Sequence, residues 1–124
     1  MLAIKTILAD VDHIATMIFD EIDIGISGQA ARKVGERMKW LSGKHQVICV
    51  THLAQIAAIA DSNIFIQKFS QGDHTITLAK TLSPEEKIQE IARLLDGDHA
   101  SELTLKHAGE MIEKAGQIPF LPTV

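Results

Sequence analysis

The sequence predicts an α/β fold in which two parallel strands are joined by a crossover helix and followed by a hairpin and carboxyl-terminal helices. Two short apolar runs, at residues 16–19 and 47–50, lie on either side of a single amphipathic stretch. The first run is too continuously apolar for a strand that exposes one face to solvent. We therefore expect both of its faces to be covered, as in parallel sheets that lie under helices.

The stretch between the two runs predicts one amphipathic helix from Gln29 to Leu41. Its apolar side chains recur at helical spacing, and charged residues fill the positions between them. Ser42-Gly43-Lys44 ends the helix, with a glycine and a cation in the places typical of a helix end. A strand, a helix and a strand in this order form a right-handed crossover, which makes the strands parallel and brings their carboxyl ends to one edge.

A hairpin is predicted after the second strand. Residues 63–69 and 75–80 flank a turn-rich connector, and we expect them to pair at the edge of the sheet. We expect one domain over residues 1–118, beginning with a helical stripe from Met1 to Asp12. The prolines of the remaining tail, 119–124, prevent a helix there.

Two further helices are predicted by their end signals. Ser83 and Glu86 form a capping box, with Pro84 at the first helical position and Gly97 at the end of the helix. Ser101 is expected to cap the second of these helices.

The composition fits one compact domain. The chain has 124 residues, of which 46% are hydrophobic, and a chain of this size buries roughly two-thirds of its unfolded surface. The first residues do not form a secretory signal, and no apolar run approaches the roughly 20 residues of a membrane-spanning helix. The formal net charge of −4 disfavours nucleic-acid binding through a basic surface. Cys49 is the single cysteine, and we expect a buried, inert thiol.

Polar residues with catalytic chemistry follow both strands. Asp20 and Glu21 come after the first strand and His52 comes after the second, so the crossover is expected to bring the three together. A carboxylate at a strand end, such as Asp20, suits Mg²⁺, because this hard ion is usually held through water. Glu21 suits the orientation or deprotonation of an attacking water, and His52 suits donation to a terminal phosphate oxygen.

These motifs resemble those of one ATPase family. MIFDEID is similar to the Walker B strand of ATP-binding-cassette (ABC) ATPases of the SMC-like group, GISG to their D-loop, and VTH to their histidine switch. Within that group, FDEIDIGISG followed by VTHLAQIAA and a helix-rich end resembles the RecN family of bacterial double-strand break repair ATPases. The resemblance covers Met1 to about Met111.

The resemblance implies a partial P-loop NTPase head of the ABC type. By matched position, it implies that Asp20 holds magnesium, that Glu21 is the catalytic carboxylate and that His52 contacts the γ-phosphate. It also implies that Ser27 and Gly28 meet the facing subunit. Many ABC proteins have aspartate where Ser27 stands, whereas the RecN variant has this serine.

The same resemblance implies cofactors, partners and location. The implied cofactors are ATP and Mg²⁺. The implied partners are the amino-terminal lobe of the same head, a second copy in a head-to-head homodimer, and DNA bound through the full-length protein. No membrane is implied, and the implied location is cytoplasmic and associated with the nucleoid. The phosphate loop GxxxxGK[ST] and the ABC signature do not occur in the sequence. We therefore expect a carboxyl-terminal piece of a split head, inactive without the missing lobe.

Two other function classes stay open. In the first, Asp20, Glu21 and Asp23 form an acidic pocket that holds Mg²⁺ for phosphoryl transfer without a P-loop. In the second, the chain is a noncatalytic assembly module that responds to neither metal nor nucleotide. The split head is favoured because neither alternative requires the histidine strand or the GISG turn.

Overall fold

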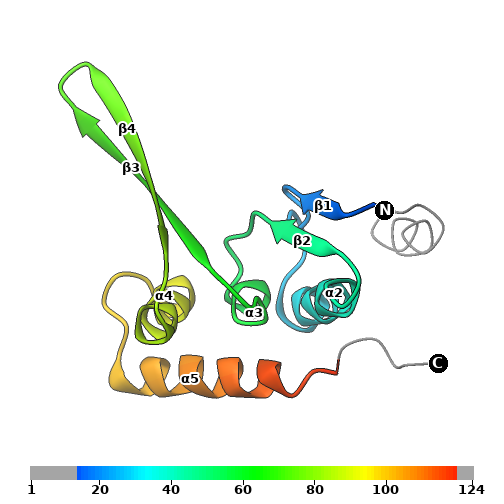
Figure 1. The fold of residues 1–124 in the computed structure, drawn as a ribbon. Coiled ribbons are helices and arrows are strands. Elements are labelled where there is room, and N and C mark those ends of the chain that lie inside the picture. The colour runs from blue at the N-terminus through cyan, green and yellow to red at the C-terminus, as the bar shows by residue number, and fades with distance from the viewer. Residues whose placement is uncertain (1–13, 120–124) are drawn as a thin grey trace.

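The computed structural model describes residues 14–119. The helix expected over Met1 to Asp12 and most of the expected tail lie outside the described residues. The described part of the chain runs through β1 (Thr16–Phe19), α2 (Gly28–Leu41), β2 (Gln46–Cys49), α3 (Ala54–Ala57), β3 (Ile64–Gln71), β4 (His74–Thr81), α4 (Pro84–Asp96) and α5 (Glu102–Gly116) (Figure 1).

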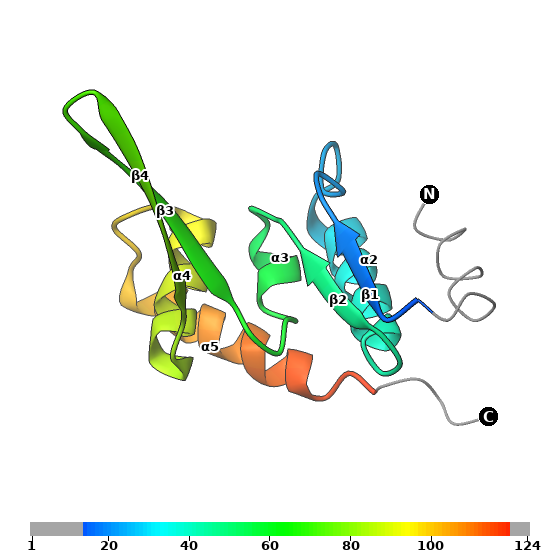
Figure 2. The same ribbon diagram turned by 45° about the horizontal axis from the view of Figure 1, so that its top comes forward.

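The first three of these elements form the predicted strand, helix and strand unit. β1 and β2 pair in parallel, with Thr16 opposite Gln46 and Phe19 opposite Cys49. α2 starts one residue before its expected beginning and ends at Leu41, as expected. Figure 2 shows α2 lying along one face of the two strands. The α/β character and the parallel pairing are thus confirmed.

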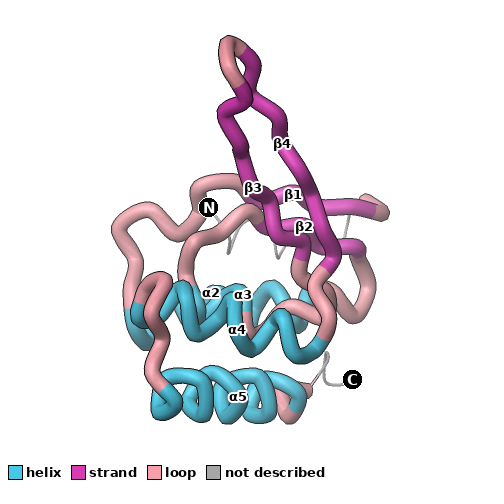
Figure 3. The backbone as a smooth tube through the Cα atoms, turned by 90° about the vertical axis from the view of Figure 1, so that its left-hand side faces the viewer, coloured by secondary structure: helices cyan, strands magenta, loops and turns pink. Residues whose placement is uncertain are grey.

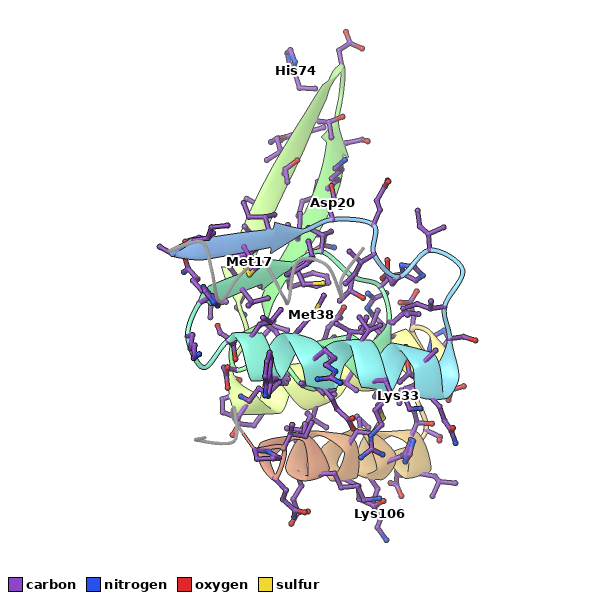
Figure 4. The ribbon with its side chains drawn as sticks, turned by 90° about the vertical axis from the view of Figure 1, so that its right-hand side faces the viewer. Met17, Asp20, Lys33, Met38, His74 and Lys106 are labelled. Atoms are coloured by element: carbon purple, nitrogen blue, oxygen red, sulfur yellow. The ribbon has the colours of Figure 1, made fainter. Side chains whose placement is uncertain are left out.

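A hydrophobic core fills the space between the strands and α2. Met17 and Phe19 of β1 pack there with Met38 and Leu41 of α2, and Figure 4 shows Met17 and Met38 between the two elements. The opposite face of β1 is open, because Ile18 is 63% exposed. The expectation that both faces of this strand are covered is therefore wrong for the described part of the chain, in which the core lies on the α2 side of the strand pair.

β3 and β4 form the predicted hairpin, but not in the predicted place. They pair antiparallel from Ile64 opposite Thr81 to Gln71 opposite His74. The hairpin is a separate two-stranded sheet, and it projects away from the helices (Figures 1 and 3). It does not extend the β1–β2 sheet, because the segment after β2 folds into α3 and leads the chain away from that edge.

The last two helices begin as predicted. Ser83 Oγ accepts a hydrogen bond from the backbone N of Glu86, and the Glu86 carboxylate accepts one from the backbone N of Ser83. Ser101 Oγ caps α5 by accepting a hydrogen bond from the backbone N of Thr104. α4 and α5 pack with α3 in a second core around Ile91. Within residues 14–119, every helix is too short or too polar to cross a lipid bilayer.

The short helix α3 joins the two cores. Ile56 packs in the first core, while the alanines around it pack in the second. Polar contacts reinforce this connection: Lys39 of α2 forms an ion pair with Asp61, and Lys87 of α4 donates a hydrogen bond to the carbonyl oxygen of Ala60. The unit of β1, α2 and β2 is therefore held to the carboxyl-terminal helices through the segment that follows β2.

Gly35 allows α2 to approach α3 closely. A Cβ at this position would lie 2.7 Å from Ile59 Cδ1 and 3.5 Å from the Cα of Ile56. The first distance is too short for a real contact, so any side chain here forces Ile59 to move. A Cβ at Gly109 of α5, in contrast, would meet no atom within 4 Å.

Gly35→Ala and Gly109→Ala are expected to change stability by different amounts. Alanine is favoured over glycine inside a helix by about 1 kcal/mol, so Gly109→Ala should stabilise the chain by about that amount. Gly35→Ala should stabilise it less or destabilise it, because the buried Ile59 side chain must move to make room for the new methyl group. Urea unfolding of both variants measures the difference, and equal gains would contradict the close approach of α2 and α3.

Candidate functional site

The carboxyl ends of β1 and β2 lie side by side. The parallel register ends with Phe19 opposite Cys49, and the backbone N of Val50 donates a hydrogen bond to the carbonyl oxygen of Phe19 at 2.9 Å. Figure 4 shows Asp20 at the end of β1. The turn that begins with Asp20 therefore leaves the sheet beside the segment that leads to His52, which is the meeting of strand ends that the sequence predicts.

Asp20 and Glu21 are both exposed. The φ angle of Glu21 is 55°, and within residues 14–119 it is the only residue other than glycine with a positive φ. The left-handed conformation costs a residue that carries a Cβ about 1–2 kcal/mol. Strained residues of this kind persist where the surrounding structure holds them, and they cluster at functional sites. The turn, rather than its own preference, sets the backbone of Glu21.

Asp23 is the buried carboxylate of this region, with 4% of its surface exposed. Its Oδ2 accepts hydrogen bonds from Thr51 Oγ1 at 2.7 Å and from the backbone N of His52 at 3.0 Å. Burial raises the pKa of this carboxyl group, but these hydrogen bonds outweigh burial and hold the pKa below its ordinary value. The ionised carboxylate thus ties the turn after β1 to the turn after β2.

The imidazole of His52 is 73% exposed, but one of its edges is held. Its Nδ1 lies 3.1 Å from Oδ2 of Asp23. A ring nitrogen that faces a carboxylate oxygen acts as the donor, so this contact favours a proton on Nδ1. The remainder of the ring faces solvent beyond the end of β2.

Ser27 and Gly28 form the turn into α2. Ser27 is the extended N-cap residue, yet its hydroxyl makes no capping hydrogen bond. Gly28 has a φ of +56°, and no atom lies within 4 Å of the position that its Cβ would take. Both residues are exposed, so this turn presents a hydroxyl not used for capping and an uncovered stretch of backbone.

The thiol of Cys49 lies near the carboxylates at the strand ends. Its pKa is raised to about 11, first by burial and then by the negative charges of Asp23 and Asp20. The thiol is therefore protonated at neutral pH, in agreement with the expected inert cysteine, although its side chain is only half-buried. The two negative charges favour a cation beside these carboxylates.

The acidic-pocket alternative finds no support in this arrangement. It requires Asp23 as a third magnesium ligand, but this carboxylate is buried and accepts hydrogen bonds from Thr51 and His52. In the part of the chain that the structure describes, no three side chains of histidine, cysteine, aspartate or glutamate are grouped to hold a metal ion. Sequence reasoning gave Asp23 no other role. Thr51 is a hydroxyl donor placed directly before His52, and it could have indicated that a carboxylate accepts hydrogen bonds at this turn.

Comparison with known proteins identifies several DNA repair proteins named RecN as relatives. No family model matches the chain. The DNA repair protein RecN of Treponema pallidum is 50% identical over 112 residues, which are 90% of this chain and 20% of that protein. RecN of Bacillus subtilis is 41% identical over 118 residues, 95% of this chain and 20% of that protein. The chain thus matches these relatives along nearly its whole length and spans about a fifth of theirs.

Glu21→Gly is expected to be more stable than Glu21→Ala by about 1 kcal/mol, because glycine adopts the left-handed conformation without a Cβ clash. Glu110, an exposed residue inside α5, provides the matched control. There the order should reverse, with Glu110→Gly less stable than Glu110→Ala by about the same amount. Chemical denaturation of the four variants tests this expectation. The same order of stability at both positions would contradict the left-handed backbone of Glu21.

Proposed function

We propose, from the premise that this chain corresponds to a segment of a RecN-family DNA repair protein, that it forms the carboxyl-terminal half of an ATP-binding and ATP-hydrolysing head. The observation that carries the proposal is the parallel pairing of β1 with β2, since the FDEIDIGISG stretch and the VTH turn follow these neighbouring strands. In the longer protein, this head would use ATP in the repair of DNA double-strand breaks.

Asp20 is proposed to hold the magnesium ion that accompanies ATP. An exposed carboxylate at a strand end suits an ion that keeps several waters and completes its coordination with phosphate oxygens. Two carboxylates lie near this position, because burial and then the negative charges of Asp23 and Asp20 raise the pKa of the neighbouring Cys49. The ion, when bound, would neutralise charge on the phosphates during transfer.

Glu21 is proposed to orient the attacking water and to accept its proton. Its side chain is exposed in the turn after β1, where a water molecule can reach it. The left-handed backbone at Glu21 supports a functional role, because a residue with a Cβ adopts this conformation only under constraint.

His52 is proposed to donate a hydrogen bond to an oxygen of the γ-phosphate. Such a donor acts mainly on the transition state, because charge on the phosphoryl oxygens must be stabilised as the bond breaks. The exposed imidazole, held at Nδ1 and open to solvent elsewhere, supports this role. Its contribution should therefore appear in turnover more than in affinity.

Ser27 and Gly28 are proposed to contact the facing head in a head-to-head homodimer. Two observations support this part of the proposal: the Ser27 hydroxyl is not used for capping, and the backbone at Gly28 is uncovered. Both groups are exposed at the start of α2, where they can meet a second subunit or its nucleotide.

The amino-terminal lobe of the same head is the proposed partner of this chain. The lobe would supply the phosphate loop, since GxxxxGK[ST] does not occur in these 124 residues. The second edge of β2 supports this partner, because among the described residues β2 pairs only with β1 and an unpaired edge is a template for another strand. DNA is proposed to bind elsewhere in the longer protein, in agreement with the net charge of −4.

In the full-length protein, Glu21→Gln is expected to lower kcat for ATP hydrolysis by roughly two or more orders of magnitude while ATP still binds, because the amide keeps the shape but accepts no proton. Asp20→Asn should instead weaken the binding of Mg²⁺-ATP. Steady-state kinetics and nucleotide binding separate the two effects, and Glu110→Gln on α5 is the matched control. Hydrolysis at the parent rate in Glu21→Gln would remove Glu21 from the catalytic site.

The 124-residue chain alone is expected to hydrolyse no ATP and to gain no thermal stability from Mg²⁺-ATP, because a ligand stabilises only a folded state that binds it. It should also self-associate through the free edge of β2. Adding the separately produced amino-terminal lobe should restore nucleotide-dependent stability. Sedimentation and thermal unfolding test these expectations, and a monomer that ATP stabilises would contradict the split head.

A further inference from the structure

We propose that Asp23 is a positioning residue for His52, so that one buried carboxylate orients the phosphate-binding ring and links it to the turn that carries Glu21. The resemblance to known ATPases assigns no role to Asp23. The inference rests on the proposed function, in which His52 donates to the γ-phosphate. Its structural part, the orientation of the ring by Asp23, can be tested without nucleotide.

Three donors from the end of β2 converge on one oxygen atom of Asp23. Oδ2 lies 2.7 Å from Thr51 Oγ1, 3.0 Å from the backbone N of His52 and 3.1 Å from Nδ1 of His52. The Asp23 side chain is 4% exposed, whereas the His52 side chain is 73% exposed. A buried anchor therefore holds an exposed ring at one edge, which limits rotation of the ring while the other edge stays accessible.

The bond to Asp23 also determines which ring nitrogen carries a proton. Because Nδ1 faces a carboxylate oxygen, Nδ1 is the donor in the neutral ring, and Nε2 points away from the anchor. The neutral ring with its proton on Nδ1 leaves Nε2 without a proton, so donation to a phosphate oxygen requires a second proton, taken up from solvent. In that imidazolium form both nitrogens are donors, and the ring donates to Asp23 from Nδ1 and to the phosphate from Nε2.

The same residue connects the two turns that carry the proposed catalytic groups. Asp23 belongs to the turn that follows Glu21, and its carbonyl oxygen accepts a hydrogen bond from the backbone N of Ile26 at 3.3 Å. On the other side, the hydroxyl of Thr51 also accepts a hydrogen bond from the backbone N of Leu53 at 3.0 Å. Displacing Asp23 would therefore disturb both the turn that carries Glu21 and the turn that carries His52.

Nitrogen NMR of the histidine-labelled chain tests the orientation of the ring in the absence of nucleotide. In the parent chain, the neutral ring of His52 is expected to carry its proton on Nδ1. Asp23→Ala should abolish this preference, while Thr51→Val should keep it, because that variant loses one bond to the carboxylate but retains the bond to the ring. His52→Gln assigns the signal. A proton that stays on Nδ1 in a folded Asp23→Ala variant would overturn the proposal.

Kinetics of ATP hydrolysis by the full-length protein test the consequence. Asp23→Asn, which keeps the shape of the side chain but not its charge, is expected to lower kcat roughly tenfold or more with little change in KM for ATP. This variant also decides the question if Asp23→Ala does not fold. A parent-like kcat in Asp23→Asn, beside a slow His52→Ala, would overturn the proposal.

The two assays distinguish failure of this inference from failure of the proposed function. If His52→Ala hydrolyses ATP at the parent rate, the phosphate role of His52 is wrong. The NMR result then decides alone whether Asp23 orients the ring. A changed protonation site in Asp23→Ala would support the positioning contact, and an unchanged one would overturn it.

Discussion

The parallel pairing of β1 with β2 is the contact on which the candidate site depends. Four residue pairs, from Thr16 opposite Gln46 to Phe19 opposite Cys49, fix how far each strand runs before its turn begins. A register shift of one residue would turn Met17 and Phe19 away from α2. It would also move the Asp23 carboxylate relative to its donors at Thr51 and His52. Core packing and the polar network thus specify the same register.

Features with local signals could be predicted from the sequence. Three residues within one turn, Ser83, Pro84 and Glu86, specify the start of α4, and the structure contains the expected capping box. The parallel sheet followed from the order of strand, helix and strand, because a crossover of this kind has one favoured geometry. The location of Asp20 and His52 beyond the strand ends followed from the bounds of the strands.

Features that depend on contacts between distant segments could not be predicted in this way. α3 is a single turn around Ile56, too short for helical periodicity, and burial between two cores supports it. The two strands of the hairpin were predictable, but not its separation from the first sheet, which depends on the direction of the chain after α3. The role of Asp23 was missed because its donors, Thr51 and His52, come from the other strand end.

The two sheets of the described chain differ in how they are supported. β1 and β2 lie against α2 and contribute to a core, whereas none of the described residues in the β3–β4 hairpin belongs to either core. A two-stranded ribbon without such support is marginally stable. Contacts with α4, an ion pair between Lys80 and Glu86 and the Arg93 guanidinium over the Phe65 ring, hold the base of the hairpin. We therefore expect the rest of the hairpin to open locally, so that its amides exchange with solvent while the strand-end turns stay closed. Proteolytic nicking at its tip, near Gly72, would leave the Asp23 network intact.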